Sequence, residues 1–128
     1  MKRRVLLFST LLVLPFGALA GDVIASGDMT LTPDEIREVF LGEKHRAGGI
    51  VLVPVDNAAA QEEFLSKVLQ TDAQKYYSRW TKKSFREGIV APALKGSDAE
   101  VIAFVRSTQG AVGYVKRPVP GFRVLHSF

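Results

Sequence analysis

The stretch Ile50-Val51-Leu52-Val53-Pro54-Val55 is a continuous apolar run in which β-branched residues predominate. Such a run is typical of a strand that is buried on both faces of a sheet. It ends at Asp56 and Asn57, either of which can cap a following helix. A helix is expected from Ala58 to Leu69, because the apolar residues of that segment share one helical face. The stretch therefore predicts a buried strand that leads directly into a helix.

Three further helix starts surround this unit, and each is a capping box, in which Ser or Thr is followed three residues later by Glu or Gln. The boxes begin at Thr32, Thr71 and Ser97. The first helix is expected to run from Pro33 to Leu41, because Gly42 supplies a stop. Further strands are expected in three short apolar stretches, residues 23–25, 111–115 and 122–126. Strands interleaved with helices predict an α/β fold, a small mixed β-sheet flanked by about four helices.

Residues 1–20 have the features of a secretory signal peptide. A positive start, Met1 to Arg4, precedes an apolar run from Val5 to Pro15, and small residues stand before Gly21. An uncleaved anchor is the alternative, but the apolar stretch is shorter than the ~20 residues of a bilayer span. We therefore expect a periplasmic protein with one domain, residues 21–128, and no transmembrane span in the mature chain.

The net charge of the chain is much smaller once residues 1–20 are excluded. The whole chain has 17 Lys and Arg against 13 Asp and Glu, a net charge of +4, which suggests nucleic-acid binding. Residues 1–20 hold three of the basic residues and no acidic ones, so residues 21–128 keep 14 basic and 13 acidic residues. This balance, together with export, argues against a nucleic-acid partner. The chain has no cysteine, so packing without disulfides must stabilise the domain.

No pattern typical of catalysis or of a metal site is found in the sequence. His45 and His126 have no ligands at metal-binding spacing and are expected at the surface or on an edge. The nucleophile-elbow, Walker and dinucleotide-binding motifs are absent. Aromatic residues at helical spacing are expected to pack in the core, with a binding cluster as the alternative. They are Tyr76, Tyr77, Trp80 and Phe85. The sequence therefore predicts a protein that is not an enzyme and needs no cofactor or metal.

Two longer motifs point to a family. Residues 31–42, Leu-Thr-Pro-Asp-Glu-Ile-Arg-Glu-Val-Phe-Leu-Gly, look like the pattern Leu-Ser-x-x-Glu-Leu-x-x-Ile-Phe-x-Gly. Residues 108–115, Thr-Gln-Gly-Ala-Val-Gly-Tyr-Val, look like Thr-Pro-Gly-Ala-Ile-Gly-Tyr-Val. In their order and spacing these segments resemble the phosphate ABC transporter substrate-binding proteins, which are type 2 periplasmic binding proteins. The resemblance covers most of residues 22–115 and implies a small, stand-alone member with the fold of one lobe.

The same resemblance marks where the chain departs from the family. In full-length phosphate binders the strand is followed by an Arg-x-x-Gly-Ser-Gly-Thr-type turn that holds the anion. Here residues 56–63 contain no Arg, Gly, Ser or Thr and add carboxylates. In addition, a chain of this length supplies about one lobe of a two-lobed cleft. A second copy or another envelope protein would then complete the cleft.

Two functions follow from these observations. The first is a solute-binding module for phosphate or another small oxyanion, which would use a loop after the first strand and the free N–H groups of a helix start. Its candidate residues are Ser26, Gly27, Thr30, Asn57, Ala58, Ala59, Ala60 and Gln61. The alternative is a non-enzymatic envelope domain for protein–protein interaction that has lost anion binding.

Overall fold

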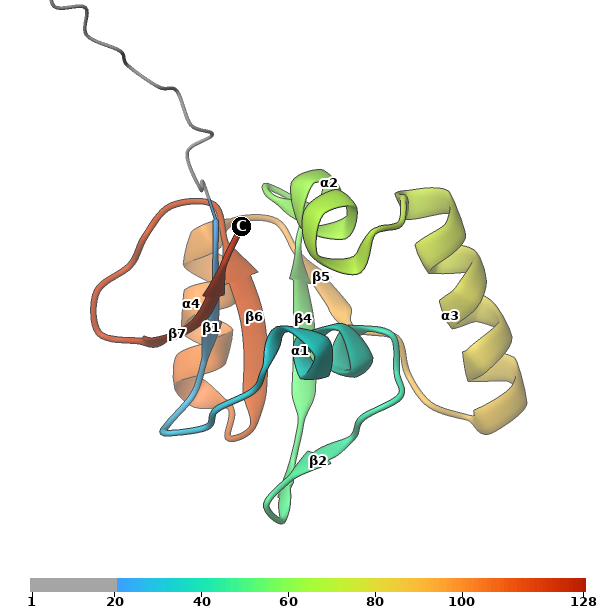
Figure 1. Ribbon diagram of the computed structural model, residues 1–128, viewed down its shortest axis with the longest axis horizontal. Helices are drawn as coiled ribbons and strands as arrows, with labels where there is room; N and C mark the ends of the chain where they lie inside the picture. The colour runs from blue at the N-terminus through green and yellow to red at the C-terminus, as the bar shows by residue number, and fades with distance from the viewer. Residues whose placement is uncertain (1–20) are drawn as a thin grey trace, which may run out of the picture.

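A five-stranded mixed sheet is the centre of residues 21–128, the part of the chain that this computed structural model describes (Figure 1). The strands are β1 (Asp22–Ala25), β4 (Val53–Asn57), β5 (Ala93–Lys95), β6 (Ala111–Val115) and β7 (Arg123–Ser127). They are ordered β5-β4-β6-β1-β7. β4 runs parallel to β5 and β6, whereas β1 runs antiparallel to β6 and β7. The predicted small α/β fold with a mixed sheet is therefore confirmed, while the predicted signal peptide lies outside the described residues.

Helices cover both faces of this sheet (Figure 1). One face carries α1 (Pro33–Phe40), α2 (Gln61–Phe64) with its π-helical continuation η1 (Leu65–Leu69), and α3 (Ala73–Glu87). The other face carries α4 (Asp98–Ser107). Side chains of β6 alternate between the two cores: Val112 and Tyr114 face the first, Ala111 and Val115 the second. This two-residue alternation is what a sheet buried on both faces requires.

Each core has its own packing. In the first, the ring of Phe64 stacks on that of Tyr114 with a centroid separation of 3.9 Å, and Phe40 meets Phe64 edge to face at 4.8 Å. In the second, α4 approaches the sheet closely at Gly113, where a Cβ would lie 2.8 Å from a methyl group of Val101. Aromatic pairs and close helix–sheet contact therefore stabilise opposite sides of the same strand, β6.

The predicted helix starts are largely confirmed. Thr32 Oγ1 accepts a hydrogen bond from Glu35 N, and Glu35 Oε1 accepts one from Thr32 N, a complete capping box. Ser97 caps α4 as predicted. α3 begins one residue later than expected, because Asp72 and not Thr71 accepts the hydrogen bond from Lys75 N.

The sequence predicts one strand over residues 50–55, but the structure divides this apolar run into two strands. Ile50–Val51 is β3, which forms a separate hairpin with β2 (Arg46–Ala47). Gly48 and Gly49 both adopt positive φ and make the turn, which a β-branched run read alone does not reveal. The predicted helix from Ala58 begins only at Gln61, and the short strand β5 was not predicted. No helix within residues 21–128 is long and apolar enough to cross a membrane.

Candidate functional site

Asp56, near the carboxyl end of β4, has a buried carboxylate. Asp56 is 1% exposed, and its two oxygens accept hydrogen bonds from the hydroxyl groups of Tyr76, at 2.8 Å, and Tyr114, at 2.7 Å. Burial raises the pKa of Asp56 to about 6, although both hydroxyl donors act in the opposite direction. Burial, followed by the nearby Asp56 carboxylate, also raises the pKa of each tyrosine. These three side chains form a closed polar cluster that joins β4, β6 and α3.

Asn57 extends the closed arrangement toward the other face of the sheet. Its Nδ2 donates to Asp98 Oδ1 at 2.7 Å and to the carbonyl oxygen of Tyr114 at 3.0 Å. The Asp98 carboxylate also accepts hydrogen bonds from the backbone N–H groups of Lys116 and Arg117. Asn57 is fully buried. The end of β4 is thus tied to α4 and to the loop after β6.

The three alanines that follow do not offer free N–H groups, and the expectation that they would is wrong. Ala58 N donates to Lys95 O at 2.8 Å, Ala59 N to Asn57 Oδ1 at 2.9 Å, and Ala60 N to Asn57 O at 3.0 Å. The reason is that the chain makes a turn here before α2 begins at Gln61. The Gln61 side chain is also engaged, since its Nε2 donates to the Tyr77 hydroxyl at 2.7 Å.

These residues nevertheless line an open depression of about 510 Å³ at the surface. We call it the β4-end face; it is lined by Ala58, Ala59, Ala60, Glu62, Glu63, Ser66, Lys67 and Lys116. Lys67 Nζ pairs with Glu63 Oε2 at 2.9 Å, which partly neutralises one of the two carboxylates. Small apolar side chains therefore occupy one part of the face and charged groups of both signs another.

The other predicted residues lie at the opposite end of the sheet. Ser26 N donates to Ala111 O, at the start of β6, whereas Asn57 bonds to Tyr114 O near its end. Three residues of a strand separate these points by roughly 10 Å. Thr30 is engaged elsewhere, because its Oγ1 accepts a hydrogen bond from Arg123 Nη2 at 3.0 Å. The structure therefore does not bring the predicted residues into one site.

Ser26 and Gly27 line a second open pocket, of about 660 Å³. Ser26 Oγ accepts a hydrogen bond from Gly110 N at 3.0 Å, and Gly27 adopts a positive φ of 69°. The pocket also contains Arg106, which the sequence analysis did not select. A cation in the last turn of a helix is common for dipole reasons alone, so its position in the sequence carried no functional signal. Its guanidinium lies 5.1 Å from the centre of the Phe122 ring.

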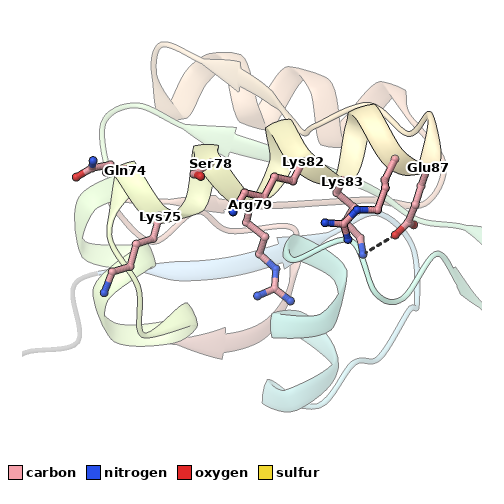
Figure 2. A pocket seen from close by; sticks show the side chains of 8 residues that line it. Gln74, Lys75, Ser78, Arg79, Lys82, Lys83 and Glu87 are labelled. Atoms are coloured by element: carbon pink, nitrogen blue, oxygen red, sulfur yellow. Dashed lines mark hydrogen bonds and ion pairs between the residues drawn. The ribbon is translucent and has the colours of Figure 1, made fainter.

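A third surface belongs to α3 alone. Figure 2 shows Lys75, Arg79 and Lys82 projecting from this helix, and they line an open hollow of about 620 Å³. The prediction that the α3 aromatics pack in the core holds for Tyr76 and Trp80, which are buried. It is wrong for Tyr77, which is 41% exposed, and for Phe85, which is 93% exposed. Helical spacing predicts that residues share a face but does not show how far along the helix the core extends.

Comparison of the chain with protein-family models gives no match, and comparison with curated proteins gives none. Within residues 21–128 there is no group of three or more His, Cys, Asp and Glu side chains that could hold a metal ion. His45 is exposed and His126 lies on the edge strand β7. The candidate sites are therefore those that the geometry defines: the β4-end face, the Ser26 pocket and the outer side of α3.

Proposed function

We propose that this chain is a non-enzymatic binding module of the cell envelope, related to the phosphate-binding proteins of ABC transporters, whose β4-end face contacts a protein partner. One observation carries the proposal: the N–H groups of Ala58, Ala59 and Ala60 all donate hydrogen bonds to acceptors within the chain. These three residues, which the sequence predicts as part of an anion-binding helix start, therefore form a turn in which none of the three N–H groups is left to hold an anion. The resemblance of the motifs at residues 31–42 and 108–115 supports the relationship.

The charges of the face also disfavour a small dianion. Glu62 and Glu63 line it together with Lys67 and Lys116, so its formal charges cancel, and among the described residues only Glu63 has a cation, Lys67, within ion-pair distance. A multivalent anion at this surface would meet at least one uncompensated carboxylate, and like charges in proximity are unfavourable. Phosphate is therefore a poor fit to the β4-end face.

A protein surface suits the same face better. Ala58 and Ala59 are exposed, and charged or polar side chains from α2, η1 and the loop after β6 surround them. A small apolar centre with a polar rim is the usual anatomy of a protein–protein interface. In a one-lobe protein, a partner lobe would cover this face; the partner is a second copy of the chain or another envelope protein.

Site-directed crosslinking tests this proposal. The chain has no cysteine, so Ala59→Cys places a single thiol on the β4-end face. A reagent with a thiol-reactive maleimide at one end and a photoreactive benzophenone at the other, applied to intact envelopes and then irradiated, should convert this variant to one species of defined higher mass. That mass distinguishes a second copy of the chain from a different protein. Ala103→Cys is the matched control, because Ala103 is an exposed alanine on α4, which covers the other face of the sheet.

The outcome that contradicts the proposal is equally concrete. If Ala59→Cys yields no adduct, or the same adducts as Ala103→Cys, the β4-end face is not a specific contact. Phosphate, sulfate, molybdate and carboxylates should leave the Tm of the purified protein unchanged. A true ligand at 100 times its Kd would stabilise the protein by ~2.7 kcal/mol and raise the Tm by about 10 °C or more.

One observation favours a small oxyanion as a second candidate ligand, at the other end of the sheet. The Ser26 pocket combines a hydroxyl group, a glycine backbone that permits close approach, and the cationic Arg106, and its lining also holds the carboxylate of Asp28. Ser26 Oγ already accepts from Gly110 N, which leaves its O–H proton to donate. If an anion in the panel raises the Tm, Arg106→Gln should abolish the shift; a shift that survives this substitution contradicts the assignment to this pocket.

A further inference from the structure

The charges of residues 21–128 are unevenly distributed. α3 carries five cations and one carboxylate within fifteen residues. The remainder of residues 21–128 carries nine basic and twelve acidic residues. The near-neutral balance of residues 21–128 therefore combines one strongly positive helix with a slightly negative remainder. A molecule with this distribution orients itself in the field of an anionic surface.

The cations of α3 form a stripe. Lys75, Arg79, Lys82 and Arg86 are spaced by four, three and four residues, which places them on one helical face about 16 Å long. Figure 2 shows Lys75, Arg79 and Lys82 along the helix. Arg79 pairs with Glu43 at 2.5 Å. Within residues 21–128, no carboxylate lies within ion-pair distance of the other three cations.

Two large apolar side chains protrude at the end of the same helix. Phe85 is 93% exposed and Val90 is 87% exposed, the highest values among the large hydrophobic residues of the described part. α3 ends at Glu87, and the positive φ of 70° at the next residue, Gly88, turns the chain between Phe85 and Val90. Phe85, next to Arg86, is stabilised when a lipid phase or another molecule covers its ring and removes it from water.

We propose that the surface formed by Lys75, Lys82, Phe85, Arg86 and Val90, here called the α3 surface, docks on an anionic lipid membrane. The cations would lie at the headgroup phosphates, and Phe85 and Val90 would enter the boundary between headgroups and acyl chains. These residues are distinct from those of the β4-end face, so the proposal does not depend on the function proposed above.

The shape of the surface favours a membrane over an acidic protein. Only α3 residues line its hollow, so no second element forms a wall. A helix of this length presents a face of roughly 22 Å by 10 Å, well below the ~800 Å² that each partner usually contributes to a stable protein complex. A lipid surface needs no preformed cavity to receive a protruding side chain, and it is laterally unlimited.

Vesicle binding tests the proposal. The purified protein is sedimented with vesicles of phosphatidylcholine, or of phosphatidylcholine and phosphatidylglycerol in equal parts. Binding is expected to the second and not to the first, and to weaken as ionic strength rises, because added salt screens the exposed charges. Equal binding to both vesicles, or none to the anionic ones, would overturn the proposal.

Three variants locate the contact. The double variant Lys82→Glu, Arg86→Glu should weaken binding by about tenfold or more, and Phe85→Ser by about tenfold. The control Arg46→Glu, Arg117→Glu makes the same change in net charge on β2 and in the loop after β6, outside both α3 and the β4-end face. It should bind as the parent does. All of these side chains are exposed, and unchanged thermal unfolding would show that the folds are intact.

Two competitors separate the lipid surface from other anions. Inorganic phosphate at matched ionic strength should not displace the protein from anionic vesicles, and neither should polyglutamate. Displacement by phosphate would show a site for the free ion, and displacement by polyglutamate would show an acidic-protein site. Either result would overturn the assignment to a membrane. Equal loss of binding in the control and in the α3 variants would do the same.

Discussion

Asp56 is the residue whose ionisation the fold perturbs most clearly among the carboxylates of residues 21–128. Its side chain is enclosed, and the hydroxyl groups of Tyr76 and Tyr114 donate hydrogen bonds to its two oxygens. Neutral hydroxyls compensate a buried charge less completely than a cation does, so the protonated form is favoured and the pKa rises to about 6. The residue therefore couples the protonation state of the protein to its packing.

The first prediction concerns the pH dependence of stability. The folded pKa of Asp56, about 6, lies above its unfolded value, so its contribution is fully present below about pH 4 and is lost as the pH rises to about 6. The loss amounts to roughly 3 kcal/mol, since one pKa unit corresponds to ~1.4 kcal/mol. Asp56→Asn should remove this component and be more stable relative to the parent at pH 7.5 than at pH 4.

Urea denaturation at the two pH values measures the difference. The substituted side chain needs no charge to fill this position, because an amide can accept from one tyrosine hydroxyl and donate to the other. Asp28→Asn is the control, since Asp28 is exposed on the loop after β1. It should follow the parent at both pH values. Parallel pH profiles for Asp56→Asn and the parent would show that the buried carboxylate does not titrate as described.

The second prediction concerns Gly110, where two requirements coincide. Its φ is +81°, and an added Cβ would lie 2.0 Å from the carbonyl oxygen of Val51. Gly110→Ala must therefore move backbone and is expected to cost at least about 3 kcal/mol, against ~1–2 kcal/mol for left-handed alanine alone. Gly27→Ala measures the cost of left-handed alanine by itself, because Gly27 has a φ of +69° but open space around its Cβ position. Equal losses of unfolding free energy in the two variants would contradict the close approach.

At the scale of elements, the start of α3 provides the third prediction. The sequence pattern selects Thr71 as the N-cap, but the structure assigns that role to Asp72, whose Oδ1 accepts from Lys75 N at 2.9 Å. Asp72→Ala should cost about 1 kcal/mol of unfolding free energy, whereas Thr71→Ala should stay within about 0.5 kcal/mol. Chemical denaturation of both variants decides between the two residues, and the reverse order would favour the sequence pattern.

The elements also show what the sequence determines locally. The three helix starts with a capping pattern were predictable within a residue because a cap is a contact between neighbours in the chain, as in the box of Thr32 and Glu35. α2, which has no side-chain cap, begins three residues later than the sequence predicts. The division of the apolar run at Leu52 was not predictable. It depends on a hydrogen bond from Leu52 N to His45 O that the Gly48-Gly49 turn creates. Local chemistry thus predicts where elements begin better than where an apolar run is divided.

The candidate site was less predictable than the fold for a related reason. The N–H group of Ala58 is occupied by Lys95 O, a residue of β5, thirty-seven positions along the chain. Likewise the partners of Asp56 come from α3 and β6. Such contacts depend on strand order, and an α/β pattern in the sequence does not specify that order. The residues were chosen as the start of a helix, whereas the structure has a turn at residues 58–60, and their availability to a ligand is a tertiary property.

At the scale of the whole molecule, the two ends of the described chain are joined. Gly21 and Phe128 exchange both backbone hydrogen bonds, at 2.9 and 2.8 Å, beside the pairing of β1 with β7. The Phe128 ring is buried in the first core, 5.5 Å from the ring of Phe64 and 6.2 Å from that of Tyr114. The last residue thus belongs to the same aromatic cluster as α2 and β6.

This arrangement predicts that Phe128 contributes to global stability and not only to the order of an edge strand. Phe128→Ala should lower the unfolding free energy by about 3–5 kcal/mol, as for other buried phenylalanines, while Val124→Ala, on the more exposed part of β7, should cost well under half as much. Trp80, the single tryptophan, lies on α3 and so reports from a distant element. If the domain unfolds as one unit, the urea transition of Phe128→Ala, followed by Trp80 fluorescence, should shift to a lower urea concentration with an unchanged slope. A Trp80 transition that stays in place while β7 loses amide-exchange protection would show that β7 frays locally and that the sheet folds without it.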